Sequence, residues 1–524
     1  MQRNPTISLL PLKSIYKEGK NPRRVPDQHL YECQNAIIKG NHIREMDQFL
    51  AGETVAEQPL FVFLKNKTGD DYANIIALSS QKVYGKSEEA ASFTELATGR
   101  TANNTYANCE VFQNVAHISA FGNAIATWDF AAASLGALTT PPSENCYEIA
   151  QYNGMLVACG AATNPDYVFF STPGTPTFQL PYVLRSPSYQ TGYTAMRAFN
   201  MGQNLMILTN KCPVIITGAA PMIRQYDLVN SPGLHLSMLR CACKGMKGVY
   251  YFSNDYRVIR NTGESYEDIS SEFFGIDFFK KDIELNASYS KFQHMWSDAG
   301  LIYFAYISQE VGASDVVVNR ILVYDEYMEG WVSDIRSRNV LCATTLDLNA
   351  MPLISTNQDY PNYPRVCLGS DVKLYKFPVR KADVADTGSN WETISSVIES
   401  KVYNVPANLL KDFVRLFTYL EVQTAGNLIT KLSIDGSAWT SSGELYKSIS
   451  LAASGPRYGD EDNTTVTRIG NIKYPWILSS KEASGYEIQV RFEHSGTKYP
   501  FVINDVFIES ISSLIEDEKE RARQ

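Results

Sequence analysis

The chain has 524 residues, of which 12% are aromatic, and carries a formal net charge of −9 with a pI near 5.4. This length accommodates more than one domain, and the acidic balance excludes a general nucleic-acid-binding surface because too few cations face the phosphates. No apolar stretch reaches the roughly 18 residues of a membrane helix. The first 20 residues lack the apolar core and cleavage site of a secretory signal peptide, so no export by that route is expected.

Residues 1–55 combine prolines and charges without a regular apolar pattern until Tyr31–Ile38. This residue pattern predicts an extended N-terminal arm with one short ordered element, which could bind along a neighbouring subunit or close a ring. The only small basic cluster of the chain, Arg23 and Arg24, lies in this arm. We take both arginines as candidate contacts with an acidic neighbour or an adaptor protein, against the alternative of ordinary exposed charge.

Residues 56–380 repeat one pattern, a turn dipeptide followed at once by a short apolar strand, at intervals of about 30 to 50 residues. The strands after the turns are AIATWD, MLVACG, NLMILT, VYYFS and LIYFAY, and their turns are Gly122-Asn123, Asn153-Gly154, Gln203-Asn204, Lys247-Gly248 and Ala299-Gly300. Gly and Asn tolerate positive φ, so these pairs indicate corners of β-hairpins. The spacing is typical of propeller blades, and counting hairpins predicts a divergent β-propeller of about six blades.

Alternating strands resume after a polar linker, and residues 390–512 are expected to form a β-sandwich or jelly-roll. Between its strands lies the polar loop SGPRYGDEDNTTVTRIGN, a candidate for contact with another subunit. Its candidate interface residues are Arg457, Tyr458, Asp460, Glu461 and Asp462, with a mobile surface loop as the alternative. Residues 513–524 form a charged tail, most simply an exposed helix end.

Catalytic chemistry finds little support in the residue patterns. The six histidines share no catalytic or metal spacing, and His117 and His294 are expected at equivalent places in two blade-opening strands, which favours packing. The nine cysteines fit no disulfide or zinc pattern and suggest reduced, buried thiols; Cys241 and Cys243 would point to one face of a strand. Acid pairs such as Asp325 with Glu326 are expected to be solvated turn residues. We therefore expect no enzyme activity, no catalytic residue, no metal and no cofactor.

The fragment Ser433-Ile434-Asp435-Gly436-Ser437-Ala438-Trp439 resembles the Asp-box turn of sialidase-type propellers. It departs from that pattern by a one-residue deletion, occurs once, and falls in the predicted sandwich rather than in a blade. The simpler interpretation is an Asp-Gly hairpin turn with a buried Trp439.

Several segments together resemble the tail-nozzle proteins of short-tailed bacteriophages, which include packaged-DNA stabilisation and tubular tail proteins. They are NPRRVPDQHLYECQNAII, YEIAQYNGMLVACGAATNPDYVFFSTPGTPTF, RAFNMGQNLMILTNKCPVIITG and VNRILVYDEYMEGWVSD. The resemblance implies a virion tail protein that is assembled in the host bacterial cytoplasm. It further implies a homo-oligomeric ring, most often a hexamer, below the portal and adaptor rings, with surfaces for fibres or a plug. The lumen would retain packaged DNA and then pass it without sequence-specific binding, as an acidic wall favours.

Two other functions remain open. A soluble propeller scaffold would organise partner proteins, although the WD and kelch signatures are missing. A glycan-binding or glycan-processing propeller would need acids, Arg or Tyr clustered at the blade centre, and the 31 tyrosines keep that possibility open.

Overall fold

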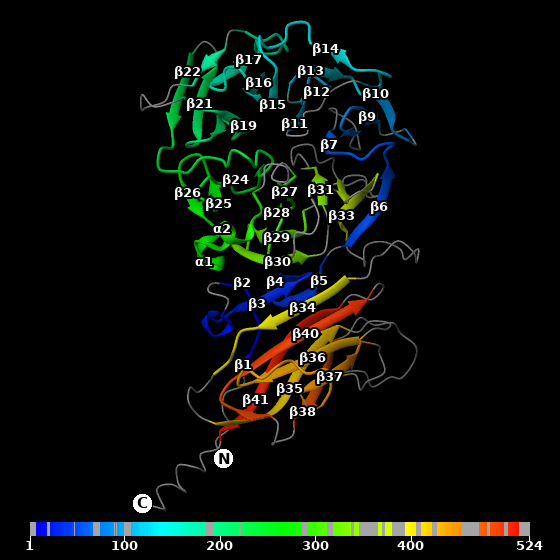
Figure 1. Ribbon diagram of the computed structural model, residues 1–524, viewed down its shortest axis with the longest axis vertical. Helices are drawn as coiled ribbons and strands as arrows, with labels where there is room; N and C mark the ends of the chain where they lie inside the picture. Colours follow the sequence, from blue (N-terminus) through cyan, green and yellow to red (C-terminus); the bar gives the residue numbers. More distant parts are fainter. Residues whose placement is uncertain are drawn as a thin grey trace, which may run out of the picture.

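The protein is described by a computed structural model that is built almost entirely of β-strands (Figure 1). The described residues are 7–17, 21–46, 48–65, 74–87, 90, 92–98, 106–120, 122–179, 181–184, 192–219, 222–285, 292–311, 318–336, 340–344, 365–368, 372–379, 394–404, 410–421, 427–443, 445–451, 471–478, 483–496 and 501–512. Within them the strands form a propeller and, beside it, a unit of two sheets.

The propeller has seven blades, one more than the hairpin count predicted, and each blade is an antiparallel set of four strands. Blade one contains β7 (Phe61–Lys65), β8 (Asn74–Leu78), β9 (Val83–Lys86) and β10 (Thr94–Ala97). Blade two contains β11 (Ala107–Phe112), β12 (Val115–Ala120), β13 (Asn123–Trp128) and β14 (Gly136–Ala137). Blade three contains β15 (Cys146–Tyr152), β16 (Met155–Ala161), β17 (Tyr167–Phe170) and β18 (Tyr182–Val183).

Blades four to six follow the same plan. Blade four contains β19 (Ala195–Asn200), β20 (Asn204–Thr209), β21 (Val214–Ala219) and β22 (Met222–Asp227). Blade five contains β23 (Ala242–Lys244), β24 (Val249–Phe252), β25 (Val258–Asn261) and β26 (Tyr266–Asp268). Blade six contains β27 (His294–Asp298), β28 (Leu301–Tyr306), β29 (Arg320–Asp325) and β30 (Gly330–Arg336). Two short helices, α1 (Ser271–Phe274) and α2 (Phe278–Asp282), connect blades five and six.

Blade seven combines the two ends of the propeller segment. Its strands β31 (Val340–Ala343), β32 (Arg365–Leu368) and β33 (Lys373–Val379) are completed by β6 (Gln48–Thr54), which precedes the first blade in the chain. The β6 strand pairs antiparallel with β33, with Thr54 opposite Lys373, and the next amide, that of Val55, donates to Val372 O at 2.8 Å. The ring is therefore closed by backbone hydrogen bonds between distant parts of the chain.

The predicted turn chemistry explains most inner hairpins. Asn153 and Gly154 have φ of 46° and 70°, and Ala299 and Gly300 have 45° and 83°, so both corners occupy the positive-φ region that tight hairpins require. The Gly122 turn differs from the prediction because it joins the second and third strands of blade two. The first hairpin of that blade turns at Gln113-Asn114, with φ of 53° and 62°.

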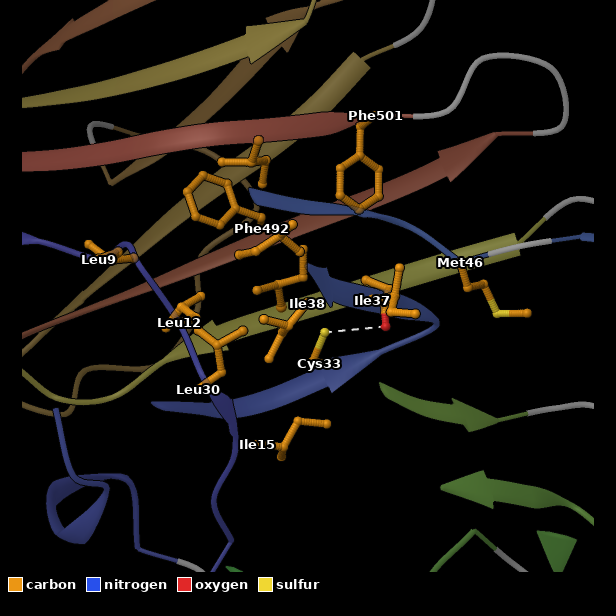
Figure 2. Packing of buried hydrophobic residues seen from close by; sticks show 14 of the residues in the cluster. Leu9, Leu12, Ile15, Leu30, Cys33, Ile37, Ile38, Met46, Phe492 and Phe501 are labelled. Atoms are coloured by element: carbon orange, nitrogen blue, oxygen red, sulfur yellow. Dashed lines mark hydrogen bonds between the residues drawn. The ribbon is translucent and has the colours of Figure 1, made fainter. Parts of the chain in front are cut away.

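The remaining strands form two sheets that share one apolar core (Figures 1 and 2). One sheet has the order β38-β35-β41-β5-β4, with β1 on β41 and β39 on β35; the other continues from blade six as β30-β3-β34-β40-β36-β37, with β2 on β3. The bounds are β1 (Ile7–Ser8), β2 (Ser14–Ile15), β3 (His29–Gln34), β4 (Ala36–Lys39), β5 (His42–Glu45), β34 (Ile394–Ser400), β35 (Lys411–Glu421), β36 (Asn427–Ile434), β37 (Tyr446–Ser450), β38 (Asn471–Ile477), β39 (Ser484–Gly485), β40 (Ile488–Gly496) and β41 (Val502–Ser512).

The segment predicted as an extended arm is largely built into these sheets. Its strands β3, β4 and β5 lie among strands from residues 394–512, and Leu12, Leu30 and Ile38 pack in the same core as Phe492 and Phe501 (Figure 2). The sequence did not reveal these strands because each is short and the sheet that contains them is completed by strands distant in the sequence. Neighbouring chains are therefore not needed to order the arm.

A continuous sheet joins the two units at β3. This strand lies between β30 of blade six and β34 of the two-sheet unit (Figure 1), with Gln34 beside Asp334 in parallel pairing. The amide of Asn35 also donates to Asp334 O at 3.0 Å. The propeller and the two-sheet unit are thus connected through hydrogen-bonded backbone as well as through side chains.

Charged side chains surround this connection, and we call them the junction cluster: Lys17, Glu32, Asp282, Glu310, Arg320, Asp334 and Arg336. Arg320, which is fully buried, donates to both carboxylate oxygens of Asp334, at 2.9 and 2.7 Å. It also donates to Asp282 at 2.9 Å, while Lys17 from the arm reaches Asp334 at 3.1 Å. Each of these charges has an opposite partner, so the cluster ties the arm to blade six and helix α2.

Candidate functional site

The central channel of the propeller is the candidate site. It has a volume of about 530 Å³ and is lined by residues from the innermost strands of all seven blades: β7, β11, β15, β19, β23, β27 and β31. These strands run in the same direction around the ring, so residues near their beginnings share one end of the channel and residues near their ends share the other. A ligand in the channel would contact several blades at once.

Buried charged and aromatic side chains lie near the end where the inner strands begin. Arg240, just before β23, donates to Leu60 O at 3.1 Å and to Leu341 O at 3.4 Å, so one side chain links blades five, one and seven. Its guanidinium carbon lies 4.4 Å from the centre of the Phe61 ring, a cation–π contact. Burial lowers the pKa of Arg240.

Glu148 and Arg197 form an ion pair between blades three and four, with Nε and Oε2 3.3 Å apart. The Glu148 carboxylate also accepts from the Ala198 amide at 3.0 Å. Arg197 lies against the rings of Tyr106 and Phe199, 4.9 Å from each centre. Burial raises the pKa of Glu148, and the nearby Arg197 offsets only part of that effect.

Polar side chains lie near the end where the inner strands finish. They are Lys65, Glu110, Gln151, Asn200 and Lys244, and all are exposed or half-buried. Lys65 pairs with Glu110 across blades one and two at 3.4 Å. This end presents mixed charge and amide groups, which suit recognition of a polar ligand or peptide segment more than of an apolar one.

Side chains also connect neighbouring inner strands around the ring. Asn108 donates to Ile149 O at 3.0 Å, Arg197 donates to Ala242 O at 3.1 Å, and Ser297 donates to Lys244 O at 2.7 Å. The amide of Leu64 donates to Thr344 Oγ1 at 3.0 Å. We call these contacts, together with Glu148, Arg197, Arg240 and the Lys65–Glu110 pair, the channel girdle.

The channel girdle was not predicted from the sequence, although a signal was present. Glu148 and Arg197 each lie within an otherwise apolar inner strand, in YEIAQY and AMRAFN. A charge at the centre of a buried strand needs a partner, so these two residues could have been singled out. The pairing of Glu148 with Arg197 could not be predicted, because the two residues lie on different blades.

The candidate interface arginines have different positions. Arg23 and Arg24 lie in a short 3₁₀ helix, Pro22–Arg24, and Arg23 pairs with Glu487 of the same chain at 2.7 Å. The Arg23 side chain is 59% exposed, so an additional partner can still reach it. The loop residues Arg457, Tyr458, Asp460, Glu461 and Asp462, like the tail 513–524, lie outside the described residues.

The two histidines thought equivalent occupy different strands. His294 opens the inner strand β27, whereas His117 lies in β12, the second strand of blade two. Both are buried, and in each the Nδ1 atom contacts the carbonyl two residues earlier, at 2.8 Å for His294 and 3.0 Å for His117. Burial, with help from Arg240, lowers the pKa of His294 to about 3. At neutral pH its imidazole is uncharged, as a packing role requires.

Two further expectations about acids and turns need correction. Asp325 and Glu326 are buried, not solvated, because Asp325 accepts from the Tyr327 and Met328 amides and Glu326 accepts from those of Met246 and Lys247. These bonds fix the turn of blade six against that of blade five.

The Asp-box-like fragment forms a turn after β36, with Asp435 and Gly436 at φ of 51° and 77°. Asp435 accepts from the Tyr486 and Glu487 amides at 2.8 Å each, so its role here is structural. Trp439 is half-buried rather than buried and lies 5.8 Å from the Arg491 guanidinium.

Across the described ranges, no group of three His, Cys, Asp or Glu side chains is placed to hold a metal ion. No helix in that part of the chain has the length and apolar character needed to cross a membrane.

Comparison with solved structures finds distant similarities that cover 63–65% of the chain. The chain is similar to the β-propeller domain of Cps50 (Swd1) from Myceliophteria thermophila, with 10% identity, a TM-score of 0.40, and coverage of 63% of this chain and 100% of that one. It is also similar to BamB from Moraxella catarrhalis, with 10% identity, a TM-score of 0.38, and 65% and 93% coverage. YCF48 bound to D1 peptide gives 10% identity, a TM-score of 0.36, and 63% and 96% coverage.

No family model and no curated protein matches the sequence. At these identities and TM-scores the likeness concerns the general fold alone. The seven four-stranded blades and their common channel define the chain as a β-propeller protein.

Proposed function

We propose that this protein is a structural β-propeller that holds partner proteins and does not act as a catalyst. The observation that carries the proposal is the union of propeller and two-sheet unit through β3 and the junction cluster. A continuous sheet and buried ion pairs resist rotation of one unit against the other. Such a body is suited to fixing the relative positions of partners bound at its two ends.

The outer rim of the propeller supports partner binding. Large apolar side chains are exposed on the outermost strands of three successive blades: Val183 on β18, Met222 and Tyr226 on β22, and Tyr266 on β26. Met222 is 83% exposed, which is unusual for an apolar residue inside a regular strand. Tyr and Met are also side chains enriched in protein interfaces.

Within this class, the tail nozzle of a short-tailed bacteriophage is the particular function that we propose. The support is the sequence resemblance, whose four segments correspond to β3–β4 of the two-sheet unit, β15–β17 of blade three, β19–β21 of blade four and β29–β30 of blade six. The partners would be other copies in a ring of about six, an adaptor ring, and fibres or a plug, in a virion assembled in the bacterial cytoplasm. DNA would pass through the lumen of the ring that the copies form.

The mass of the purified protein in solution, by light scattering at several concentrations, tests this proposal. A discrete ring of about six copies, or a monomer that forms rings when an adaptor complex is added, would support the nozzle. A monomer under all conditions that captures defined protein partners would favour the general scaffold. A monomer that instead binds or cleaves sugars on a glycan array would contradict both and support the glycan-processing alternative.

A further inference from the structure

Two cysteines lie directly opposite one another in blade seven. Cys342 of β31 and Cys367 of β32 are register partners in the antiparallel pair, and both are completely buried. Residues opposite in such a pair project from the same face of the sheet. The two thiols therefore face each other across neighbouring strands, although 25 positions separate them in the sequence.

This arrangement fits the geometry of a disulfide. Opposite residues in an antiparallel pair have Cα atoms about 4.5 or 5.5 Å apart, and disulfides occur at Cα separations of about 4.4 to 6.8 Å. The thiols already interact: burial alone would raise the pKa of Cys342, but a hydrogen bond with the Cys367 side chain and the nearby Arg240 cation lower it. The Cys342 sulfur also contacts Pro59 O at 3.6 Å.

The other cysteines provide an internal comparison. Cys146 and Cys159 lie on the neighbouring strands β15 and β16, but Cys146 is opposite Ala161 and Cys159 is opposite Glu148. Cys241 and Cys243 are separated by one residue along the same segment. Among cysteines in the described strand pairs, only Cys342 and Cys367 are register partners.

We propose that Cys342 and Cys367 are a modification site at which a two-electron oxidant of the peroxide class forms one disulfide. The Cys342 thiolate attacks a peroxide oxygen, the O–O bond breaks, and protonation of the departing hydroxide releases water and leaves a sulfenic acid. The Cys367 sulfur then attacks the Cys342 sulfur, the S–OH bond breaks, the S–S bond forms, and the thiol proton leaves with hydroxide as a second water. A dithiol reductant reverses the modification.

The consequence would be local to ring closure. The disulfide would join the first two strands of the blade that β6 completes, and it would enclose the chain between residues 342 and 367 in a covalent loop. Cross-linking a loop of this length restricts the unfolded chain and stabilises the fold. The oxidised propeller would therefore open less readily at blade seven. This inference does not depend on the proposed function.

The test uses the full-length protein, treated under native conditions with hydrogen peroxide and then alkylated after denaturation. We expect the count of free thiols to fall from nine to seven, with one cross-linked peptide that contains Cys342 and Cys367. The unfolding temperature should rise by several degrees and return to its original value after treatment with dithiothreitol. Cys367→Ser should abolish both changes, whereas Cys159→Ser should preserve them.

Other outcomes would overturn the proposal. They are a full complement of nine thiols after treatment, a disulfide that joins any other pair, or conversion of Cys342 to sulfinic acid without a cross-link. Because peptide mapping is done on the unmodified sequence, the result stands even if a variant fails to fold.

Discussion

Asp334 in the junction cluster and Glu148 in the channel girdle are both fully buried carboxylates, yet their surroundings move their pKa in opposite directions. Burial tends to raise the pKa of each. At Asp334 the cations Arg320, Lys17 and Arg336 outweigh that effect and hold the pKa well below its usual value. At Glu148 the one nearby cation, Arg197, does not outweigh the effect of burial, so the pKa is raised.

The difference shows how the two regions use charge. The junction cluster surrounds its acid with several cations and so favours full ionisation at the connection between the two units. The girdle instead places its cations against backbone carbonyls and aromatic rings, as Arg240 and Arg197 do. We infer that the junction contributes more to stability per carboxylate than the channel does.

The largest expected effect is at the junction. Asp334→Asn keeps the shape of the side chain but leaves Arg320 and Lys17 without their shared acid, and breaking a buried pair in this way typically costs about 3–5 kcal/mol. Urea unfolding at pH 7 measures the loss. A loss of unfolding free energy smaller than about 1 kcal/mol would refute the proposed difference between the two regions.

The pH dependence of the same variant sharpens this test. The folded pKa of Asp334 is depressed, so its contribution is fully present above the unfolded value near 3.8 and is lost as pH falls through the folded pKa. Wild-type stability should therefore decline more steeply below about pH 4 than that of Asp334→Asn. Parallel curves for the two proteins would contradict the assignment.

A smaller effect is expected at the channel. Glu148→Gln retains an oxygen for the Ala198 amide but removes the charge that faces Arg197, and we expect a loss of about 1–3 kcal/mol. Glu110→Gln, at the more exposed end of the channel, is the matched control and should cost less than about 1 kcal/mol. If Glu148→Gln proves as damaging as Asp334→Asn, the contrast between the two regions fails.

His294 gives a prediction for acid conditions. Its folded pKa of about 3 lies below the ordinary histidine value of 6.5, so the unfolded state takes up the proton first and stability falls as pH decreases below about 6.5. Between pH 7 and pH 5.5 this residue should account for a loss of about 1 kcal/mol. Urea unfolding at both pH values should show that His294→Phe loses less stability between pH 7 and pH 5.5 than the wild type does. An equal loss in the two proteins would contradict this role of His294.

The smallest effect is expected at the surface. Arg23→Ala removes an ion pair with Glu487 in which the arginine is largely exposed, so the change should stay below about 1 kcal/mol and diminish in high salt. Thermal unfolding with and without salt measures it. If the same variant loses ring assembly while its stability is unchanged, Arg23 acts between copies, as proposed for the arm.

Local chemistry explains which parts of the fold were predictable from the sequence. The Asn153-Gly154 and Ala299-Gly300 corners were found because positive φ is a property of the residues themselves. The place of the Gly122 turn within its blade was misjudged, since a hairpin between the second and third strands has the same local signature as one between the first and second. The strand that completes blade seven was missed because β6 and β33 are hundreds of residues apart.

The candidate site was less predictable than the fold. Glu148 and Arg197 lie on blades three and four, and nothing local in the sequence indicates that these blades bring the two charges together. The Glu326 carboxylate was expected in solvent, because its partners, the amides of Met246 and Lys247, belong to a different blade. Buried polar contacts between blades are tertiary features that residue patterns do not encode.

The position of β6 also has a consequence for biosynthesis. The ribosome completes Thr54 before it begins β33 at Lys373, so the closing strand stays unpaired while the 318 intervening positions are made. At about 5–20 residues per second, this delay is roughly 15 to 65 s. During that time β6 is an unpaired strand on an unfinished ring, exposed to pairing with other chains. Expression at low temperature, which lengthens the delay, should therefore not improve the yield unless a chaperone covers this segment.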